Sequence, residues 1–399
     1  MRLRCTGPAE VLEAIAALGR TEDVSWSPDG RRIALAGIAV DKLLILGVDC
    51  LLEDGRKCVH VSDAMHVASS SLKRPHGVYW VSDGTVAVAS REGNVSFFDI
   101  PAAERPVSVC RLQPLATVGK GDTELLKSPG SLCARPLGSD LLELWVCNGF
   151  AHYVTHHLLD ARSGLAHVDT QILMREGLEV PDGVALDPAG DWVAISNHDR
   201  HVVALYRNDA RLEAAARPSA ELHGLSYPHG VCFAAGGRVL LVADAGAPHI
   251  ALFRRAPQGW LDGASEPHAL VRVLDDATFR KGQHNPREGG PKGVDVHEPW
   301  GLLVTTCAEQ PLAFFDLDAI LPPDVRHQET LVPAQAAGEG LRTAVLRLAR
   351  DVSAREALLT AAVRHEAALV RASWSWRVTA PLRSLAGGWL RWMSRFRKH

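Results

Sequence analysis

Residues 181–190 read PDGVALDPAG, and close variants of this stretch occur at residues 75–84 (PHGVYWVSDG) and 228–237 (PHGVCFAAGG). Three more copies begin at residues 21, 129 and 291, so the chain carries six copies, spaced by 47 to 63 residues. A repeat of this period indicates that one structural unit is stacked on copies of itself.

Each copy opens a unit with the same internal pattern. In the fourth unit, short apolar runs typical of β-strands cover 184–186, 192–196 and 201–206, with a turn at 187–190. A fourth run is less regular, as at 270–273. Short strands separated by Gly and Pro, repeated six times, predict an all-β fold, a six-bladed β-propeller.

The β pattern stops near residue 322. Before the first copy, Pro8 to Leu18 predict a helix outside the ring, and apolar residues at steps of four and three between Leu341 and Leu369 predict a second helix, packed on the propeller or on a partner. The expected division is an N-terminal helix (1–20), the propeller (21–322), a linker and helix (323–370) and a tail (371–399).

Composition narrows the class of protein. With 47% hydrophobic and 22% charged residues, the chain is typical of a globular protein. Its net charge of -3 differs from the excess of basic residues that is typical of nucleic-acid-binding proteins. It has no run of 18 apolar residues and no signal-peptide pattern at its start. The eight cysteines are scattered without a Cys-x-x-Cys pair, which favours buried thiols in a reducing cytoplasm.

The middle residue of each Pro-x-Gly copy is the first candidate for function. Because the innermost strand of a blade runs from one face to the other, we expect this residue to point toward the mouth of the central channel. Two carboxylates and two imidazoles would then converge, a ligand set suited to zinc, manganese or calcium. Alternatively, these side chains accept backbone N–H groups, and the lysine neutralises the carboxylates. In ring order the residues are Glu22, His76, Gly130, Asp182, His229 and Lys292.

The repeats resemble a known superfamily. Residues 181–207, PDGVALDPAGDWVAISNHDRHVVALYR, resemble an NHL repeat. The whole of 21–320 is similar to the six-bladed propellers that include the gluconolactonase (senescence-marker) family. That resemblance implies the fold, and it leaves the activity open because propellers host both enzymes and binding proteins.

The gluconolactonase resemblance also implies roles for two residues. In that family a Glu that precedes a Trp on the first blade and an Asp in a Pro-Asp-Gly context bind a metal, and the Asp is the catalytic base. Glu22 and Asp182 match those places. The two Asn ligands of the family are not matched, since Gly130 stands before Asp182 and His76 and His229 are additional.

Further ligand-binding candidates lie on the same rim. Residues that leave the second strand of a blade should reach it, and a polar insertion at 276–290 should lie over the mouth, either as a lid on an anionic or sugar-like ligand or as an unstructured excursion. The candidates are Arg91, Asn197, His198 and Asp244 after second strands, and Arg280, His284 and Arg287 in the insertion.

The tail has a different composition. Residues 371–399 hold seven basic residues and no acidic one, interleaved with four tryptophans. Arginine with tryptophan is typical of a helix that binds an anionic membrane surface, while docking on the acidic propeller or on a partner is the alternative. The residues expected to make this contact are Trp374, Trp376, Arg377, Trp389, Trp392 and Arg395.

The tail carries a second resemblance. Residues 373–383, SWSWRVTAPLR, resemble the tails of bacterial glycosyltransferases and related proteins of cell-surface polysaccharide assembly. This resemblance covers eleven residues and implies a cytoplasmic protein that works peripherally at the inner membrane.

Two functions follow as hypotheses. The first is a propeller that binds a saccharide, a lipid-linked sugar or a glycosyltransferase in cell-surface polysaccharide biosynthesis. The alternative is a metal-dependent hydrolase of a sugar lactone or ester, in which Glu22 and Asp182, with His76 and His229, hold the ion and Asp182 is catalytic. We expect no nucleic-acid partner.

Overall fold

The computed structural model describes residues 1–119, 121–257, 259–260, 266–284 and 287–325, together with Thr343, Leu346 and Arg347. The chain divides into two compact units, 1–342 and 343–399, and the fold described below belongs to the first. The predicted second helix and the predicted membrane-binding tail lie outside the described residues apart from those three positions. No helix in the described part of the chain is long and apolar enough to span a bilayer.

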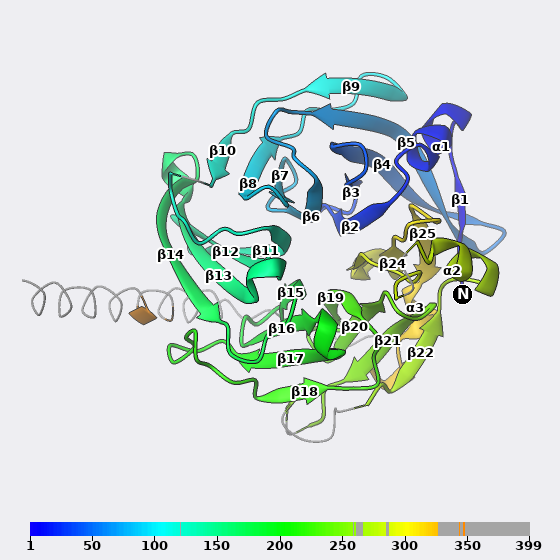
Figure 1. Cartoon of the computed structure of the whole chain (residues 1–399). Helices are drawn as coiled ribbons and strands as arrows, with labels where there is room; N and C mark the ends of the chain where they lie inside the picture. The colour runs from blue at the N-terminus through cyan, green and yellow to red at the C-terminus, as the bar shows by residue number, and fades with distance from the viewer. Residues whose placement is uncertain are drawn as a thin grey trace, which may run out of the picture. The chain divides into compact units, whose positions relative to one another are not determined.

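Six sheets, built mainly from antiparallel strands, surround a central axis, so the predicted six-bladed β-propeller is confirmed (Figure 1). Blades 1 and 2 contain β2 (Thr21–Trp26), β3 (Arg32–Gly37), β4 (Lys42–Glu53) and β5 (Arg56–Ala68), then β6 (Pro75–Trp80), β7 (Thr85–Ser90), β8 (Asn94–Asp99) and β10 (Ala116–Val118). Blades 3 and 4 contain β11 (Pro129–Leu137), β12 (Leu141–Asn148), β13 (Tyr153–Asp160) and β14 (Ala166–Met174), then β15 (Pro181–Leu186), β16 (Trp192–Asn197), β17 (Val202–Arg207) and β18 (Ala220–Leu222). Blades 5 and 6 contain β19 (Pro228–Ala234), β20 (Val239–Asp244), β21 (His249–Arg254) and β22 (Ala269–Arg272), then β23 (Val294–His297), β24 (Leu302–Thr305) and β25 (Ala313–Asp316).

In blades 1 to 5 the repeat copies begin the inner strands, and in blade 6 the copy at 291–293 directly precedes β23. The pairing of these strands explains the pattern. In β15 the register with β16 shifts between Pro181 and Gly183, so Asp182 lies in a β-bulge. The inner strands of blades 1, 2, 3 and 5 shift at the same place. A bulge turns the side chain of its extra residue out of the regular alternation. The repeated bulge therefore directs the variable residue toward the axis.

The glycine of the pattern is needed for contact between blades. A Cβ added at Gly183 would collide with the carbonyl oxygen of His229 in blade 5, and one at Gly77 would collide with the carbonyl oxygen of Gly130 in blade 3. The missing side chain thus lets the variable residue of the next blade approach closely. This contact keeps the variable residues of neighbouring blades at a similar height along the axis.

The core lies between neighbouring sheets. Each of six apolar clusters joins strands of two adjacent blades, as where Trp26 of blade 1 packs with Val304 and Phe314 of blade 6. Trp145 in blade 3 and Trp192 in blade 4 are fully buried. Because burial of apolar surface is spread around the ring, the scaffold can hold polar groups at its axis.

The N-terminal residues join blade 6 to blade 1. Strand β1 (Arg4–Thr6) pairs in parallel with β5, while the Leu3 N–H donates to the Phe314 carbonyl of β25 at 2.8 Å. Helix α1 (Ala9–Ala16) lies within the predicted helical range, but the prediction missed β1, which belongs to the first sheet. β9 (Val107–Arg111) lies between β8 and β10 of blade 2 in sequence but pairs with β5 of blade 1.

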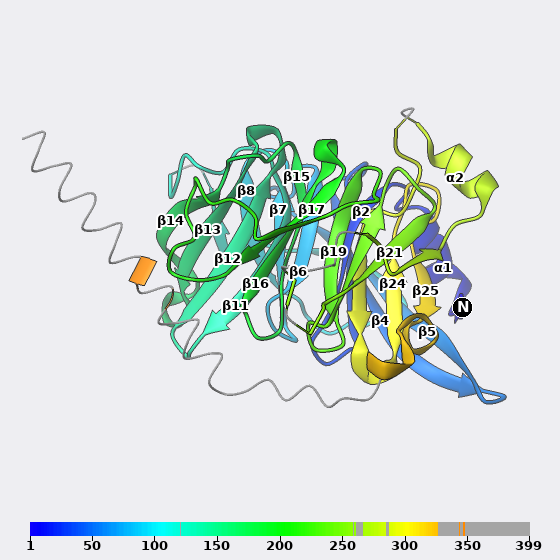
Figure 2. The same cartoon turned by 90° about the horizontal axis from the view of Figure 1, so that it is seen from below.

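The insertion after blade 5 is partly helical. Helix α2 (Asp276–Gly282) follows Asp275, whose carboxylate caps it by accepting the Thr278 N–H at 2.7 Å, and a shorter helix, α3 (Leu317–Ile320), follows β25. The sequence prediction treated the insertion as irregular because it overlooked this cap. Figure 2 shows α2 beside one face of the propeller and the tip of the β4–β5 hairpin beyond the other.

Candidate functional site

The repeat places five polar side chains at one mouth of the channel. Glu22, His76, Asp182, His229 and Lys292 are each at most 5% exposed. Opposite members meet as the spacing predicted: the rings of His76 and His229 stack with centroids 5.4 Å apart. The ring residues are therefore one buried cluster.

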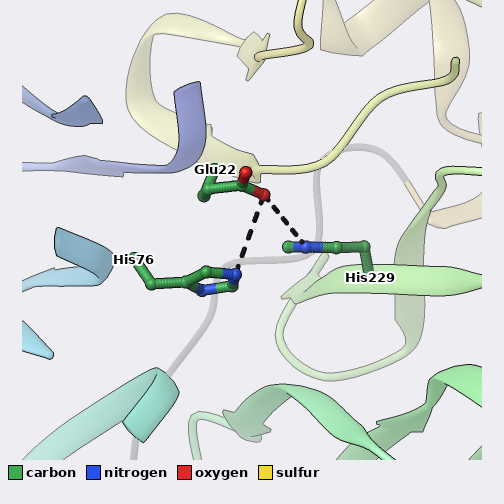
Figure 3. Close-up of side chains that lie close together, drawn as sticks. All are labelled: Glu22, His76 and His229. Carbon is green, nitrogen blue, oxygen red and sulfur yellow. Dashed lines mark ion pairs between the residues drawn. The ribbon is translucent and has the colours of Figure 1, made fainter. Parts of the chain in front are cut away.

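Glu22 lies at the centre of this cluster, as Figure 3 shows. Its Oε2 is 3.5 Å from His229 Nε2, 3.7 Å from His76 Nε2 and 3.5 Å from Lys292 Nζ, and it has no hydrogen-bond partner among the residues that the structure describes. Its Oε1 accepts from the Arg20 guanidinium. Glu22 is thus paired on one side and, on the other, faces three nitrogens at distances longer than ordinary hydrogen bonds.

Blade 3 leaves a gap in the ring, and an arginine fills it. The variable residue there is Gly130, and Arg91, which follows β7, extends into the free space. Arg91 Nη2 is 2.9 Å from Asp182 Oδ1 and 2.7 Å from His76 Nε2. Asp182 Oδ2 is also 3.1 Å from His229 Nε2. Asp182 therefore has a partner on each oxygen.

An outer layer completes the pairing of charges. Glu288 of the insertion lies 2.6 Å from Lys292 Nζ, 3.1 Å from His198 Nε2 and 4.0 Å from Arg20. The carboxylates of Glu22, Asp182 and Glu288 thus face the cations of Arg20, Arg91 and Lys292. The mouth carries many charges but little net charge.

The electrostatics keep the carboxylates ionised. Burial acts to raise the pKa of Glu22, but Lys292 and the two imidazoles outweigh it and hold that pKa well below its usual range. Burial likewise opposes ionisation of Asp182, and His229 and Arg91 reverse the effect, so its pKa is also lowered. Burial, assisted by Arg91, lowers the pKa of His76 well below 6.5.

The cluster can be tested for its fit to a divalent ion. Oxygen and nitrogen atoms of Glu22, His76 and His229 lie within 4.8 Å of one another, and zinc ligands about 2.0–2.2 Å from the metal sit roughly 3.3–3.6 Å apart. However, Arg91 already donates toward His76 Nε2, and Lys292 faces Glu22. Unit charges 4 Å apart interact by about 4 kcal/mol near a protein surface, and a divalent ion doubles that repulsion. The donors suit a metal, but the ring does not fit one while both cations stay in place.

Two predicted rim residues are engaged with the backbone. Asn197 accepts the Glu179 N–H at 2.7 Å and donates to the Gly177 carbonyl at 2.8 Å. Asp244 accepts the Ser226 N–H at 2.7 Å, and burial raises its pKa to about 6. The structure therefore places both at strand ends, where their side chains accept backbone N–H groups.

The predicted residues of the insertion have contacts with residues other than the five at the Pro-x-Gly positions. Arg280 is 4.0 Å from Asp276, and His284 pairs with Glu309 at 2.9 Å. Arg287 lies with its guanidinium 6.0 Å from the ring centroid of Tyr227. Of the candidates outside the Pro-x-Gly positions, the structure brings Arg91 and His198 to the ring cluster.

Sequence reasoning missed Arg20 and Glu288. Arg20 directly precedes the first repeat copy, and Glu288 is four residues before Lys292. Their positions next to repeat copies were the signal that could have found them. The aromatic residue Phe150, which follows β12 and is 71% exposed with Arg91 against its ring, was also missed.

Comparisons with known proteins identify no family for this chain. No protein-family model and no curated protein matches the chain. Among solved structures, the β-propeller domain of Cps50 (Swd1) from Myceliophteria thermophila is similar over 74% of this chain and 83% of that domain, with 14% identity and a TM-score of 0.42. This similarity says nothing about what the chain binds.

Proposed function

We propose that this propeller is a binding protein whose channel mouth recognises a saccharide-type ligand, and that it serves cell-surface polysaccharide biosynthesis. The buried cluster of paired charges carries the proposal. Removing charged groups from water is costly, and apolar side chains of similar size would often stabilise a fold at least as well. Such a cluster at the mouth of a channel is better explained by recognition than by stability.

The rim also offers faces for a sugar ring. Phe150 is exposed with Arg91 behind it, and Tyr227 has Arg287 on one side and His201 in an edge contact 4.4 Å away. Aromatic faces pack on the apolar face of a sugar, while charged groups bind its hydroxyls. A neutral or acidic saccharide, free or attached to a lipid or glycosyltransferase, would use both.

Phe150→Ala is expected to weaken saccharide binding about fivefold, because a stacked aromatic contact contributes roughly 1 kcal/mol. Binding of the full chain would be measured by calorimetry after a panel of neutral and acidic oligosaccharides has identified a binder. Leu52→Ala, at another exposed apolar residue near the end of β4, should leave the affinity unchanged. Equal affinities of Phe150→Ala and the unaltered chain would exclude this rim as the site.

The alternative, a metal-dependent hydrolase of a sugar lactone or ester, is less well supported by the geometry. It needs an ion held by Glu22 and Asp182, with His76 and His229 as further ligands. The atoms that would bind the ion are shared with Arg91 and Lys292. We therefore derive no reaction step, and the predicted zinc, manganese or calcium remains a prediction.

We further propose that the tail binds an anionic membrane surface, which would place the protein peripherally on the inner membrane. Replacing Arg395 and Arg397 with Gln is expected to weaken binding to vesicles containing about 30% anionic lipid by roughly 30-fold, at about 1 kcal/mol for each arginine. Sedimentation with vesicles at low salt measures this. The matched control replaces Arg105 and Arg211, two exposed arginines of the propeller, with Gln. Equal loss in both variants would show general charge attraction without a role for the tail.

A further inference from the structure

One nitrogen of Arg91 joins two side chains that would otherwise be metal ligands. Nη2 lies 2.7 Å from His76 Nε2 and 2.9 Å from Asp182 Oδ1. These two atoms are themselves 3.8 Å apart. A guanidinium nitrogen carries two protons, so it can donate one to each atom at the same time. Arg91 thus links the pair as a bound cation would.

Blade 3 is shaped to hold this guanidinium. A Cβ at Gly130 would lie 3.2 Å from Arg91 Nη1, and one at Gly149 would lie 2.9 Å from it. The Ser128 carbonyl accepts from Nη1 at 3.4 Å, and Phe150 lies against the guanidinium at 5.3 Å. Two glycines, a carbonyl and an aromatic ring therefore accommodate the side chain.

Lys292 supplies a second cation across the cluster. Its Nζ is 3.5 Å from Glu22 Oε2 and 2.6 Å from Glu288 Oε2. The two carboxylates closest to the axis, those of Glu22 and Asp182, therefore each face a basic side chain of the protein. A divalent ion placed between them would meet positive charge from both directions.

We propose that Arg91 occupies the place of a divalent metal between His76 and Asp182. Its positive charge keeps metal ions out of this mouth, so the propeller binds ligands that carry no metal ion. The exclusion of metal ions depends on the Arg91 side chain, because the oxygen and nitrogen atoms that could bind a metal already lie close together. Without Arg91, the lone pair of His76 Nε2 and one oxygen of Asp182 become free beside Glu22 and His229. Imidazole nitrogens and carboxylate oxygens are a set that binds zinc.

The experiment measures zinc binding to the full chain, purified without a histidine tag, by calorimetry with the metal alone. The unaltered protein is expected to bind zinc weakly at this mouth. Arg91→Ala should bind one ion at least 100-fold more tightly, and Arg91→Gln should bind with an intermediate gain. Adding His76→Ala to Arg91→Ala should remove the gain. Thermal melting shows whether each variant is folded.

Arg200 provides the matched control. It lies on the same rim after β16 but pairs with the Gly177 carbonyl and with Glu221, away from the ring. Arg200→Ala should bind zinc as the unaltered protein does. Tight stoichiometric zinc in the unaltered chain that is lost in His76→Ala would overturn the proposal, even if no Arg91 variant folds. A folded Arg91→Ala without any gain would overturn it as well.

Discussion

Asp182→Ala is expected to lower the free energy of unfolding by about 3–5 kcal/mol, the usual cost of removing one partner from a buried ion pair. Asp182 is 5% exposed and accepts from Arg91 at 2.9 Å. Without it, the guanidinium of Arg91, whose side chain is 11% exposed, loses its carboxylate. The loss would be measured by urea denaturation followed by tryptophan fluorescence.

The control for this prediction is an exposed ion pair. Asp209, 40% exposed, pairs with Arg211, 90% exposed, and Asp209→Ala should change stability by less than about 1 kcal/mol. If both variants lost the same small amount, Asp182 would not be part of a buried network. Asp182→Asn, which keeps the shape and one acceptor oxygen, should fall between them.

The second large effect is expected on acidification, through a histidine in blade 3. His157 is fully buried between Thr170 at 2.8 Å and Thr155 at 2.9 Å. Burial, assisted by the neighbouring His156 and His167, lowers its pKa from 6.5 to about 3. In the unfolded chain the ring binds a proton near pH 6.5, but in the folded chain it does not until about pH 3.

Stability must therefore fall as the pH decreases below 6.5, since the unfolded state binds more protons there. His157 contributes a loss of about 1.4 kcal/mol for each pH unit, or roughly 3 kcal/mol between pH 6.5 and pH 4. His157→Gln should remove this part of the slope when unfolding is measured in urea at several pH values. His268→Gln, at an exposed histidine, should keep the slope of the unaltered protein. Parallel slopes in all three proteins would mean that His157 is not held neutral.

Much of the fold could be predicted because the repeat encodes local geometry. The copies that keep the Pro-x-Gly pattern share a proline, a bulged residue and a glycine at which a Cβ would collide with the next blade. The start of the inner strand could therefore be predicted from the sequence. The repeat does not predict β1 and β9. Both pair with β5 of blade 1 across long stretches of sequence, and no repeat marks such partners.

The candidate site also has one part that the repeat predicts and another part that it does not. The meeting of His76 and His229 follows from the register of the repeat and needed no other information. The position of Arg91 depends on Gly130 and Gly149, two residues of another blade that leave room for it. That kind of dependence is a property of three-dimensional packing, so the sequence suggested Arg91 as a rim residue but did not indicate its partners.

The pairing of the first residues with β25 has a consequence for biosynthesis. Leu3 pairs with Phe314, so residues made before blade 1 complete a sheet whose strands are made after blade 5. Blades 3, 4 and 5 draw all their strands from continuous stretches and can fold while translation continues. Closing the seam between blades 6 and 1 joins residues far apart in sequence, which is the slow kind of step. We therefore expect the ring to stay open between blades 6 and 1 during translation until β25, which ends at Asp316, has left the ribosome.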